Sequence, residues 1–426
     1  MMVESERAAR VSGWMWLRYA AAILLSAALL FPLRYSEGWW LFESISLLDP
    51  VLVFVFCLAL LSVAARASIY TGQNLVFGVL LLPFLFAVAS LAWSVDAATT
   101  IKSIVVAGSA VAAYLSVVVL LRGVAASDLL KGIMVAVWVL LMTGVASYLP
   151  GSLLAPELLH SEREGSGFIL SYRARFSHPF LGLSNSFATI LVMLLPFVYA
   201  ARRLGVWPKR AFWTGIMLVA GIVATGSRGV LVAMVVVFGA LWLYRSWSVG
   251  TMPRGVFGGT LAVFGVSAAF LWLSPEALQH FGGRLSGGNV EARLAAFFAA
   301  LEITVQTHPF GIGSGVSLGS VSDVSLRSVH NAYLQNVLWF GVVGGIALSI
   351  AMWLLPWLVL RVKVSTVQAL IAKRALATSL LLLMVVNLSQ ASWEGSVLRV
   401  QIYVIVALGV LLIRQCDEVR PGLRRG

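Results

Sequence analysis

The stretch SVHNAYLQNVLWFGVVGGIALSIAMWLLPWLVLR, residues 328–361, joins a polar beginning to an apolar run that exceeds one membrane crossing. A helix crosses the hydrocarbon core of a bilayer with about 20 mostly apolar residues. The run at 331–360 is therefore expected either to tilt or to begin above the bilayer as a helix that then enters it. Gly341, Gly344 and Gly345 lie where such a transition would fall.

The rest of the chain repeats this apolar pattern. Hydrophobic residues make up 60% of the 426 residues, charged residues 11%, and the mean hydropathy is +0.95. A soluble domain of this length could not bury such a sequence. We predict an all-α polytopic membrane protein whose residues 1–426 form a single integral membrane domain. Twelve spans are expected, near 14–33, 45–64, 75–92, 102–121, 132–150, 181–200, 211–226, 229–244, 256–274, 331–360, 375–391 and 397–413.

The distribution of Lys and Arg predicts the orientation. Cytoplasmic loops of membrane proteins retain positive charge. With the N-terminus inside, the inner segments hold 20 of the 30 basic residues. An even number of spans then places both termini in the cytoplasm and two long loops, 151–180 and 275–330, on the outer face.

Loops of this length usually carry function. Within the second loop, a helix beginning near Asn289 is expected to lie flat at the outer interface, and the His308–Pro309 pair is expected to end it. Its apolar face would consist of Leu294, Phe297, Phe298, Leu301 and Val305.

The basic residues of the outer side are almost all arginine. Only Lys102 accompanies Arg34, Arg163, Arg173, Arg175, Arg228, Arg284, Arg293, Arg327 and Arg399. A planar guanidinium donates two parallel hydrogen bonds to a phosphate and stays charged when desolvated. A phosphate-binding site is one interpretation. Pairing with outer acids or contact with lipid headgroups is the other, and we expect it for Arg34, Arg163 and Arg399.

Arg228 is the strongest candidate among these arginines. It lies in ATGSRGVLVAM between two expected spans, with almost no loop. An arginine at the membrane boundary is costly unless it faces a polar cavity or a partner. Gly226 and Gly229 are expected to let the backbone turn tightly beside it. The alternative is structural anchoring to an acid such as Glu394.

Four further arginines are candidates for the same site, and Arg284 is the weakest of them. Arg293 falls at the edge of the apolar face of the interfacial helix, and Arg284 lies in the flexible stretch FGGRLSGG. Arg173 and Arg175 precede the sixth span, and Arg175 is the nearer of the two. Which of these outer arginines converge is left open by the sequence.

His330 is a candidate general base. If Ser328 caps the helix, His330 lies in the first turn, where the helix dipole and nearby arginines favour a neutral imidazole. A neutral imidazole accepts a proton near neutral pH. The alternative is a histidine that satisfies polar groups at a helix end.

The other histidines suggest no metal site. No pair has H-x-x-x-H spacing, no Cys cluster accompanies them, and no D-x-D occurs, so no metal is expected. His308, before Pro309, indicates helix termination. His178, before Pro179, is expected to position the sixth span.

Four segments resemble a known family. They are RFSHPFLGLSNSFATILVMLLP (175–196), GSRG (226–229), the run from Arg293 to Gly315 that ends in HPFGIGSG, and HNAYLQNVLWFGVVG (330–344). Together they resemble the O-antigen ligase and O-antigen polymerase superfamily of bacterial envelope glycosyltransferases, over about residues 170–400. The family pattern has an adjacent Pro and Asn, whereas Pro179 and Asn185 are separated here.

The resemblance implies a lipid-donor glycosyltransferase-like (GT-C-like) fold in the bacterial inner membrane, with a cavity that opens to the periplasm beneath the interfacial helix. A ligase of this family moves a glycan from undecaprenyl pyrophosphate to lipid A–core oligosaccharide by an inverting, metal-independent reaction without a cofactor. We expect a ligase because one long outer loop dominates and the chain is compact. The expected partners are thus the lipid-linked donor, the lipid A–core acceptor and membrane lipids, and no nucleic acid is indicated. With this resemblance, His330 is the expected base. Arg175, Arg228, Arg293 and Arg284 are the expected pyrophosphate ligands, and Arg228 and Arg293 would also act in catalysis. Asn331 and His178 are expected to make further substrate contacts.

Two other functions remain open. A polymerase of O-antigen or exopolysaccharide would share the chemistry and differ in its acceptor. A transporter or flippase of a phosphorylated lipid would use the outer arginines as a binding station. Transporters place ionisable groups near the bilayer midplane, whereas the charged candidates gather here at one face, which favours catalysis.

Overall fold

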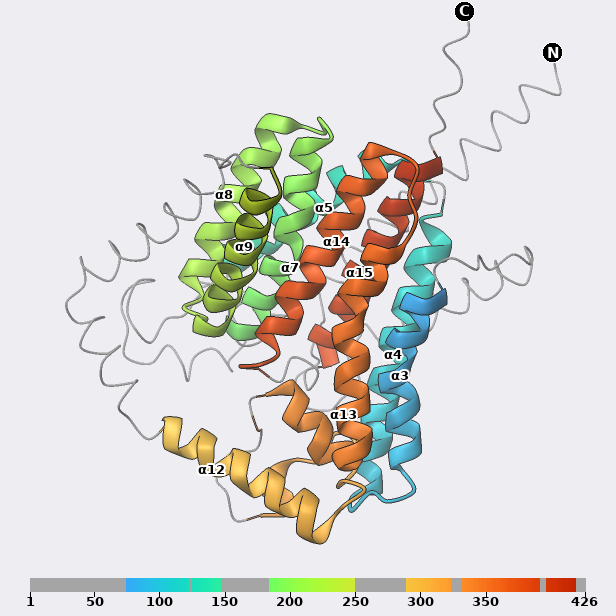
Figure 1. The fold of residues 1–426 in the computed structure, drawn as a ribbon, viewed down its shortest axis with the longest axis vertical. Helices are drawn as coiled ribbons and strands as arrows, with labels where there is room; N and C mark the ends of the chain where they lie inside the picture. Colours follow the sequence, from blue (N-terminus) through green and yellow to red (C-terminus); the bar gives the residue numbers. More distant parts are fainter. Residues whose placement is uncertain are drawn as a thin grey trace, which may run out of the picture.

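The computed structural model describes residues 74–122, 124–146, 184–249, 289–322, 329, 331–390 and 396–418. Every regular element in these ranges is helical. The α-helices are α3 (Asn74–Ser90), α4 (Ala97–Leu120), α5 (Ala126–Ala146), α7 (Ser184–Arg203), α8 (Pro208–Ala224), α9 (Arg228–Val249), α12 (Asn289–Glu302), α13 (Ala332–Arg361), α14 (Val367–Val386) and α15 (Ser396–Glu418) (Figure 1). A π-helix, η3 (Ile303–Thr307), continues α12, and a short 3-10 helix, η4 (Leu318–Ser320), precedes α13.

The helices are those of a multi-pass membrane protein. Within the described ranges, α4, α5, α7, α13, α14 and α15 are long and apolar enough to cross a membrane. The expected spans near 14–33, 45–64 and 256–274 lie outside these ranges. Each of the other nine expected spans overlaps a helix. The all-helical membrane class predicted from composition is confirmed for this part of the chain.

The helix α4 begins earlier than hydropathy predicts. It was expected from residue 102 and begins at Ala97. Asp96 caps it, because its Oδ1 accepts from the Thr99 N–H at 3.1 Å and its Oδ2 from the Thr99 hydroxyl at 2.6 Å. The Thr99 hydroxyl and N–H hold the pKa of Asp96 below its usual value. Capping, which hydropathy does not report, sets this boundary.

The helix α14, which was expected over 375–391, also begins early. It begins at Val367 because the Thr366 side chain accepts from a backbone N–H of its first turn. The charged pair that interrupts the apolar run lies inside the helix, and Lys373 Nζ donates to the carbonyl of Val362 at 3.0 Å. A lysine in the second turn of one helix thus binds carbonyls at the end of the preceding helix.

The centre of the bundle is formed by α7, α14 and α15. Most residues of α7 and α15 are buried, whereas α4, α5 and α13 expose more of their apolar surface. The Ser379 hydroxyl of α14 donates to the Met193 carbonyl of α7 at 2.8 Å. On α15, the Tyr403 hydroxyl donates to the Leu80 carbonyl of α3. These buried bonds connect the central helices to one another and to the outer layer.

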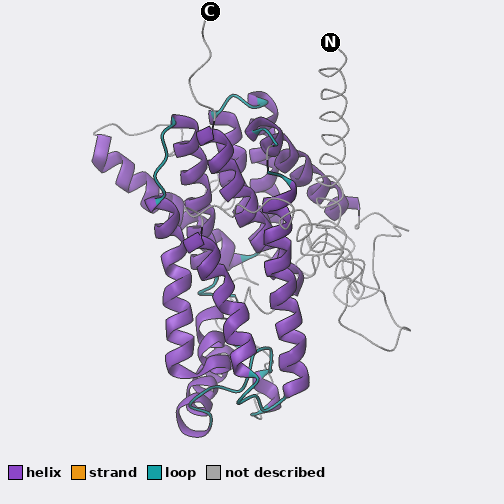
Figure 2. Ribbon diagram, turned by 90° about the vertical axis from the view of Figure 1, so that its right-hand side faces the viewer, coloured by secondary structure: helices purple, strands orange, loops and turns teal. Residues whose placement is uncertain are grey.

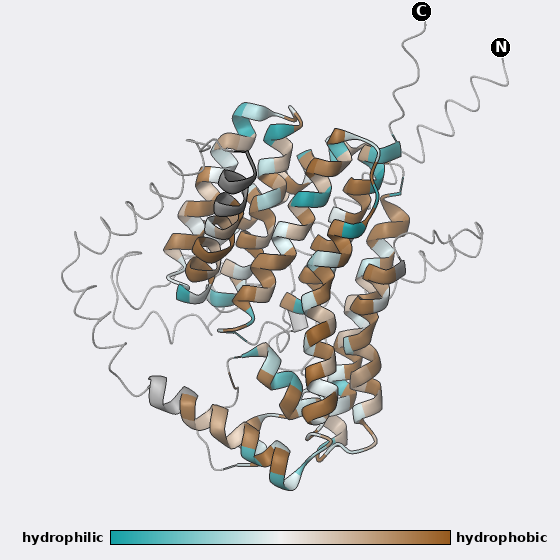
Figure 3. Cartoon of the chain, viewed as in Figure 1, coloured by the Kyte–Doolittle hydropathy of each residue, from teal (hydrophilic) through white to brown (hydrophobic). Residues whose placement is uncertain are grey.

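One end of the bundle carries the basic loops. The connections α7–α8 and α13–α14 lie at the top in Figure 1, and hydrophilic residues gather there in Figure 3. Trp207 in the first connection lies under two cations, with the Arg210 guanidinium 4.7 Å and the Lys131 ammonium 5.8 Å from its ring centre. By the charge rule this is the end expected to face the cytoplasm.

At the opposite end, α13 folds back on itself at Gly341. This residue has φ 73° and ψ 175°, and it separates a short arm at 332–340 from a long arm at 342–361. The arms are antiparallel: the Tyr333 ring stacks on Trp353 with centroids 5.9 Å apart. The helix breaks at Gly341, one of the three glycines where a change was expected. The expected change, from a helix above the bilayer to one that enters it, is wrong, because the run reverses there as a helical hairpin.

The hairpin is held by the loop that contains HPFGIGSG. The Ile312 N–H donates to the Leu338 carbonyl at 2.9 Å, and the Trp339 indole N–H donates to the Val316 carbonyl at 2.9 Å. On its other side the loop accepts from the Val95 N–H at 3.1 Å, in the α3–α4 connection. This motif therefore connects the hairpin turn to the α3–α4 pair.

The helix α12 crosses the same end of the bundle (Figures 1 and 2). Its small residues Ala296 and Ala300 are buried, while Phe298 and Val305 are 63% and 66% exposed. The large apolar side chains thus face away from the protein, as an interfacial helix requires. The helical segment ends at His308, which confirms the predicted termination.

Candidate functional site

The candidate site is a polar junction at those ends of α8, α9 and α14 that lie away from the basic loops. Three parts of the chain meet there: the α8–α9 turn at 225–229, the segment 387–390 that follows α14, and the start of α13 at 331–333. We call this the 390 junction. It combines the GSRG and HNAYLQN segments, which are about a hundred residues apart in the sequence.

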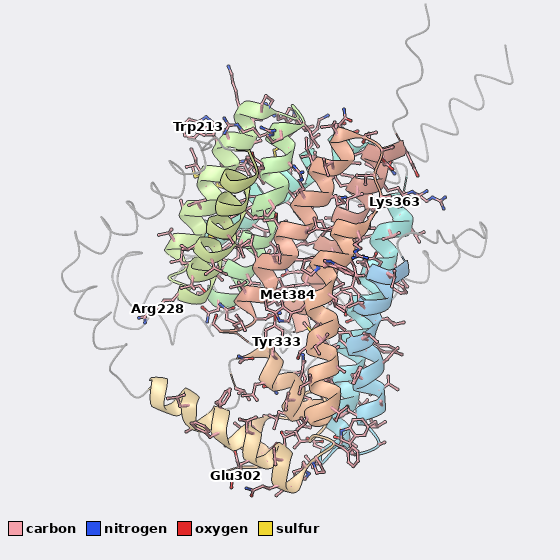
Figure 4. All side chains as sticks on the ribbon, viewed as in Figure 1. Trp213, Arg228, Glu302, Tyr333, Lys363 and Met384 are labelled. Carbon is pink, nitrogen blue, oxygen red and sulfur yellow. The ribbon has the colours of Figure 1, made fainter. Side chains whose placement is uncertain are left out.

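Arg228 begins α9 directly after the turn. Gly226 takes a left-handed φ of 61°, and the Ser227 carbonyl accepts the first helical bond from the Leu231 N–H at 3.1 Å. Arg228 is partly buried, and Figure 4 shows it at the lower end of α9, at about the height of Tyr333. The prediction that Arg228 lies at a tight turn between two helices is confirmed.

The turn makes close contact with the segment after α14. A side chain at Gly229 would overlap the Ser389 hydroxyl and bring its Cβ to 3.1 Å from Ser389 Cβ. Gly229 is not one of the described glycines with a positive φ. Its role is therefore close approach, and the expected role in turning the backbone is wrong for this glycine.

Gln390 bridges the turn and α7. Its Nε2 donates to the Ser227 hydroxyl at 3.0 Å, and its Oε1 accepts from the Thr189 hydroxyl at 3.2 Å. Thr189 also approaches the Asn185 carbonyl at 2.9 Å, so its single hydrogen is shared. All three side chains of the bridge are buried. The described end of the 175–196 segment thereby also reaches the junction.

Asn331 caps the short arm of α13. Its Oδ1 accepts from the N–H groups of Tyr333 and Leu334 at 2.9 and 3.0 Å, and its Nδ2 donates to the Leu388 carbonyl at 3.0 Å. The helix thus begins at Ala332, and the predicted Ser328 cap, with His330 in the first turn, is wrong. Asn caps as well as Ser, and here it has the additional partner across the junction. Its contact with substrate stays a prediction.

Behind Asn331, two more polar side chains line the junction. The Tyr333 hydroxyl donates to the Met384 carbonyl at 2.7 Å. Figure 4 labels both residues. The Asn387 carbonyl accepts from the Ala332 N–H at 2.9 Å. The Asn387 carboxamide is fully buried, and neither of its polar atoms has a hydrogen-bond partner within the described ranges.

Sequence reasoning missed Asn387 and Gln390. They lie in NLSQ, which ends an apolar run that was assigned to a membrane span. Two amide side chains at the end of such a run are the signal that was available, because buried amides need partners.

The junction lies inward of the hairpin turn. The short arm leads from Asn331 to Gly341, ten residues on, and so covers about 15 Å of helix length. Because the arm is antiparallel to the long arm, Asn331 lies closer to the middle of the bundle than Gly341 does. The site is thus recessed from the outermost end of the molecule, which α12 crosses.

The side chains of the remaining expected site residues are outside the part of the chain that the structure describes. Arg175, His178, Arg284 and His330 lie outside the described residues. Arg293 falls within α12 by its backbone, and its side chain is outside the described part. Convergence of the arginines on pyrophosphate stays a prediction.

Arg399 departs from its expected role. It was expected to pair with outer acids or to reach lipid headgroups, but its side chain is only 4% exposed. It lines a cavity of about 10 Å³, room for about one water molecule, together with Ser314, Asn336 and Met352. Burial inside the bundle excludes the headgroup contact, so that part of the expectation is wrong.

Among the described residues, no three His, Cys, Asp or Glu side chains group closely enough to hold a metal ion. No model of a known protein family matches the sequence, and no curated protein matches it. The fold and the junction define the class directly: an all-helical, multi-pass membrane protein with a polar junction recessed at one end.

Proposed function

We propose that this protein is an O-antigen ligase of the bacterial inner membrane, which transfers a glycan from undecaprenyl pyrophosphate to lipid A–core oligosaccharide on the periplasmic side. The observation that carries the proposal is the 390 junction. The GSRG turn contacts Ser389 and Gln390, and the start of HNAYLQN contacts Asn387 and Leu388. Segments chosen for their resemblance to one family thus adjoin in space.

The proposed reaction is a single displacement. An acceptor hydroxyl oxygen forms a bond to the anomeric carbon while the bond from that carbon to the pyrophosphate oxygen breaks, which inverts the configuration. His330 takes the proton of the acceptor hydroxyl, and undecaprenyl pyrophosphate leaves with the bonding electron pair. Positive groups held in place before the reaction stabilise the charge that develops on the leaving group.

Arg228 is the best described of these positive groups. It begins α9, so the positive end of the helix dipole adds to the charge of its guanidinium. Its partial burial strengthens attraction to an anion relative to the same group in bulk water. Arg175, Arg284 and Arg293 are the proposed further ligands of the pyrophosphate, and His178 and Asn331 are proposed to contact the substrates.

The finer architecture belongs to the same proposal. We assign twelve spans, a GT-C-like arrangement, cytoplasmic termini and no cofactor. In this arrangement α12 covers the recessed junction, with its exposed aromatic face in the outer leaflet.

Reconstituted transfer tests the proposal. Purified protein in nanodiscs is mixed with lipid-linked glycan and lipid A–core, and modified lipid A is measured. We expect His330→Ala to abolish transfer while the donor still binds, and Arg228→Ala to weaken donor binding as well. Lys363→Ala is the matched control, because it removes an exposed basic residue at the opposite end.

Each other outcome has a defined meaning. Transfer at the wild-type rate by the His330→Ala variant would eliminate the base assignment. Chains that lengthen on undecaprenyl pyrophosphate would replace the ligase by the polymerase. Movement of the lipid-linked glycan across the bilayer with no bond broken would replace both by a transporter.

A further inference from the structure

We infer that Gln390 is a positioning residue for Arg228: its carboxamide fixes the α8–α9 turn against α7 and so sets where the guanidinium lies. The geometric part stands on the described contacts alone. The kinetic consequence rests on the proposed function.

The carboxamide suits this role because it carries a donor and an acceptor on one planar group. Nε2 donates to Ser227 in the turn, at 3.0 Å, and Oε1 accepts from Thr189 on α7, at 3.2 Å. An ammonium has no acceptor, and an apolar side chain has neither a donor nor an acceptor. Gln390 is 9% exposed, so water does not readily replace these partners.

Gln390 acts on Arg228 through Ser227. The Ser227 N–H donates to the Thr225 hydroxyl at 3.3 Å, and its carbonyl accepts from Leu231 in the first turn of α9 at 3.1 Å. The main-chain groups of Ser227 thus order the turn internally, and its hydroxyl connects the turn to Gln390. Arg228 is the next residue, so a shift of Ser227 moves the first residue of α9.

A small shift has a large effect on an anion site. A displacement of about 1 Å at a positioned group can lower a rate about 100-fold, because the guanidinium must meet oxygens at hydrogen-bond distance. The neighbouring Gly229–Ser389 contact resists movement of the turn toward 387–390. The Gln390 bridge resists movement away from α7.

The first experiment is a double-mutant cycle with Gln390→Met and Ser227→Ala. Methionine keeps the length of glutamine and makes neither bond. We expect each single variant to raise KM for the lipid-linked donor and to lower kcat/KM about 10- to 100-fold, with KM for the acceptor unchanged. The kcat/KM of the double variant should be no lower than that of the more affected single variant, because both substitutions remove the bond between Gln390 and Ser227.

The matched control is Ser379→Ala, which removes another buried hydrogen bond between α14 and α7, remote from the junction. It should lower stability and leave both KM values unchanged. Thr189→Val tests the second half of the bridge if Gln390→Met does not fold. Independent, multiplicative effects in the cycle, or an unchanged KM for the donor, would overturn the inference.

The second experiment requires no activity. Nitroxide labels are placed at Ala224 and Val343, both exposed, in a background without native cysteines, and the distance distribution is measured by pulsed electron resonance. Gln390→Met should broaden the distribution, and Ser379→Ala should not. An unchanged distribution in Gln390→Met refutes the bridge. A wild-type protein without transferase activity refutes the proposed function and leaves this distance test in force.

Discussion

Two glycines flank Ser227 and Arg228, and they meet different physical needs. Gly226 takes φ 61°, which side chains rarely tolerate. Gly229 is required because Ser389 occupies the space where a Cβ would be. The GSRG pattern in the sequence indicates the turn correctly, but it cannot distinguish these two reasons, since the second depends on a residue 160 positions away.

Gly229→Ala should destabilise the protein by about 1–3 kcal/mol, the usual range for an overpacked core position. The added Cβ overlaps Ser389 Oγ, so the turn must move away from the segment after α14. Thermal unfolding in detergent or nanodiscs measures the change.

Two matched variants complete this test. Gly239→Ala lies in the same helix with no atom within 4 Å of the added Cβ, and it should change stability by no more than about 1 kcal/mol. Ser389→Gly in the Gly229→Ala background should restore most of the loss. Equal stability of Gly229→Ala and Gly239→Ala would contradict the packing described here.

At the scale of elements, the α13 hairpin decides where the candidate site lies. Asn331 would lie at the outer end of a single straight helix. The reversal at Gly341 instead brings Asn331 inward, next to the ends of α9 and α14. The HPFGIGSG loop holds the reversal through hydrogen bonds to the carbonyls of Leu338 and Trp339. The conspicuous motif thus has a structural role at the turn of the hairpin, whose short arm leads to the site.

Gly341→Ala should disrupt the hairpin. Its backbone lies in a region occupied almost only by glycine, where another residue costs about 1–3 kcal/mol. The added Cβ would also overlap the Pro309 carbonyl and lie 2.8 Å from Phe310 Cα. We expect lower stability and faster amide exchange at Ile312 and Gly313, whose N–H groups bond to the hairpin.

Gly132→Ala is the control, because its added Cβ meets no atom within 4 Å. Amide exchange at Ile312 that stays as slow in Gly341→Ala as in Gly132→Ala would show that the loop does not depend on the hairpin geometry.

At the scale of the whole molecule, charge and packing divide the two ends. The basic connections α7–α8 and α13–α14 lie at one end (Figure 1), whereas Arg228 and Tyr333 of the 390 junction lie near the middle of the molecule's height (Figure 4). The membrane potential and the insertion machinery act on the loops of such a protein, so the basic end is expected to remain in the cytoplasm. In the proposed orientation the junction is on the periplasmic side, where the proposed substrates meet.

Cysteine labelling tests this orientation. In a background that lacks the native cysteines, Ser320→Cys should react with a membrane-impermeant maleimide in intact spheroplasts. Lys363→Cys should react only after lysis. Both positions are exposed, so access depends on the side of the membrane. Labelling of Lys363→Cys in intact spheroplasts would reverse the topology and remove the junction from the periplasmic face.

For the candidate site, the sequence indicated some residues and hid others. Arg228 and Asn331 were found because polar residues beside apolar runs stand out in a membrane sequence. Gln390 and Asn387 were not found, because they end a run that hydropathy assigns to lipid. Gln390 is identified by its hydrogen bonds to distant parts of the chain, Ser227 in the α8–α9 turn and Thr189 on α7.

The sequence by itself determined the helical membrane class, since lipid leaves a helix as the way for long apolar segments to satisfy their own backbone groups. It also determined which loops are basic and that the helical segment of α12 and η3 ends at His308. The tertiary structure alone decided that α13 reverses, that Arg399 is buried, and that the α8–α9 turn meets the segment after α14. Hydropathy reports the preference of each segment for lipid, whereas these features depend on contacts between segments far apart in the chain.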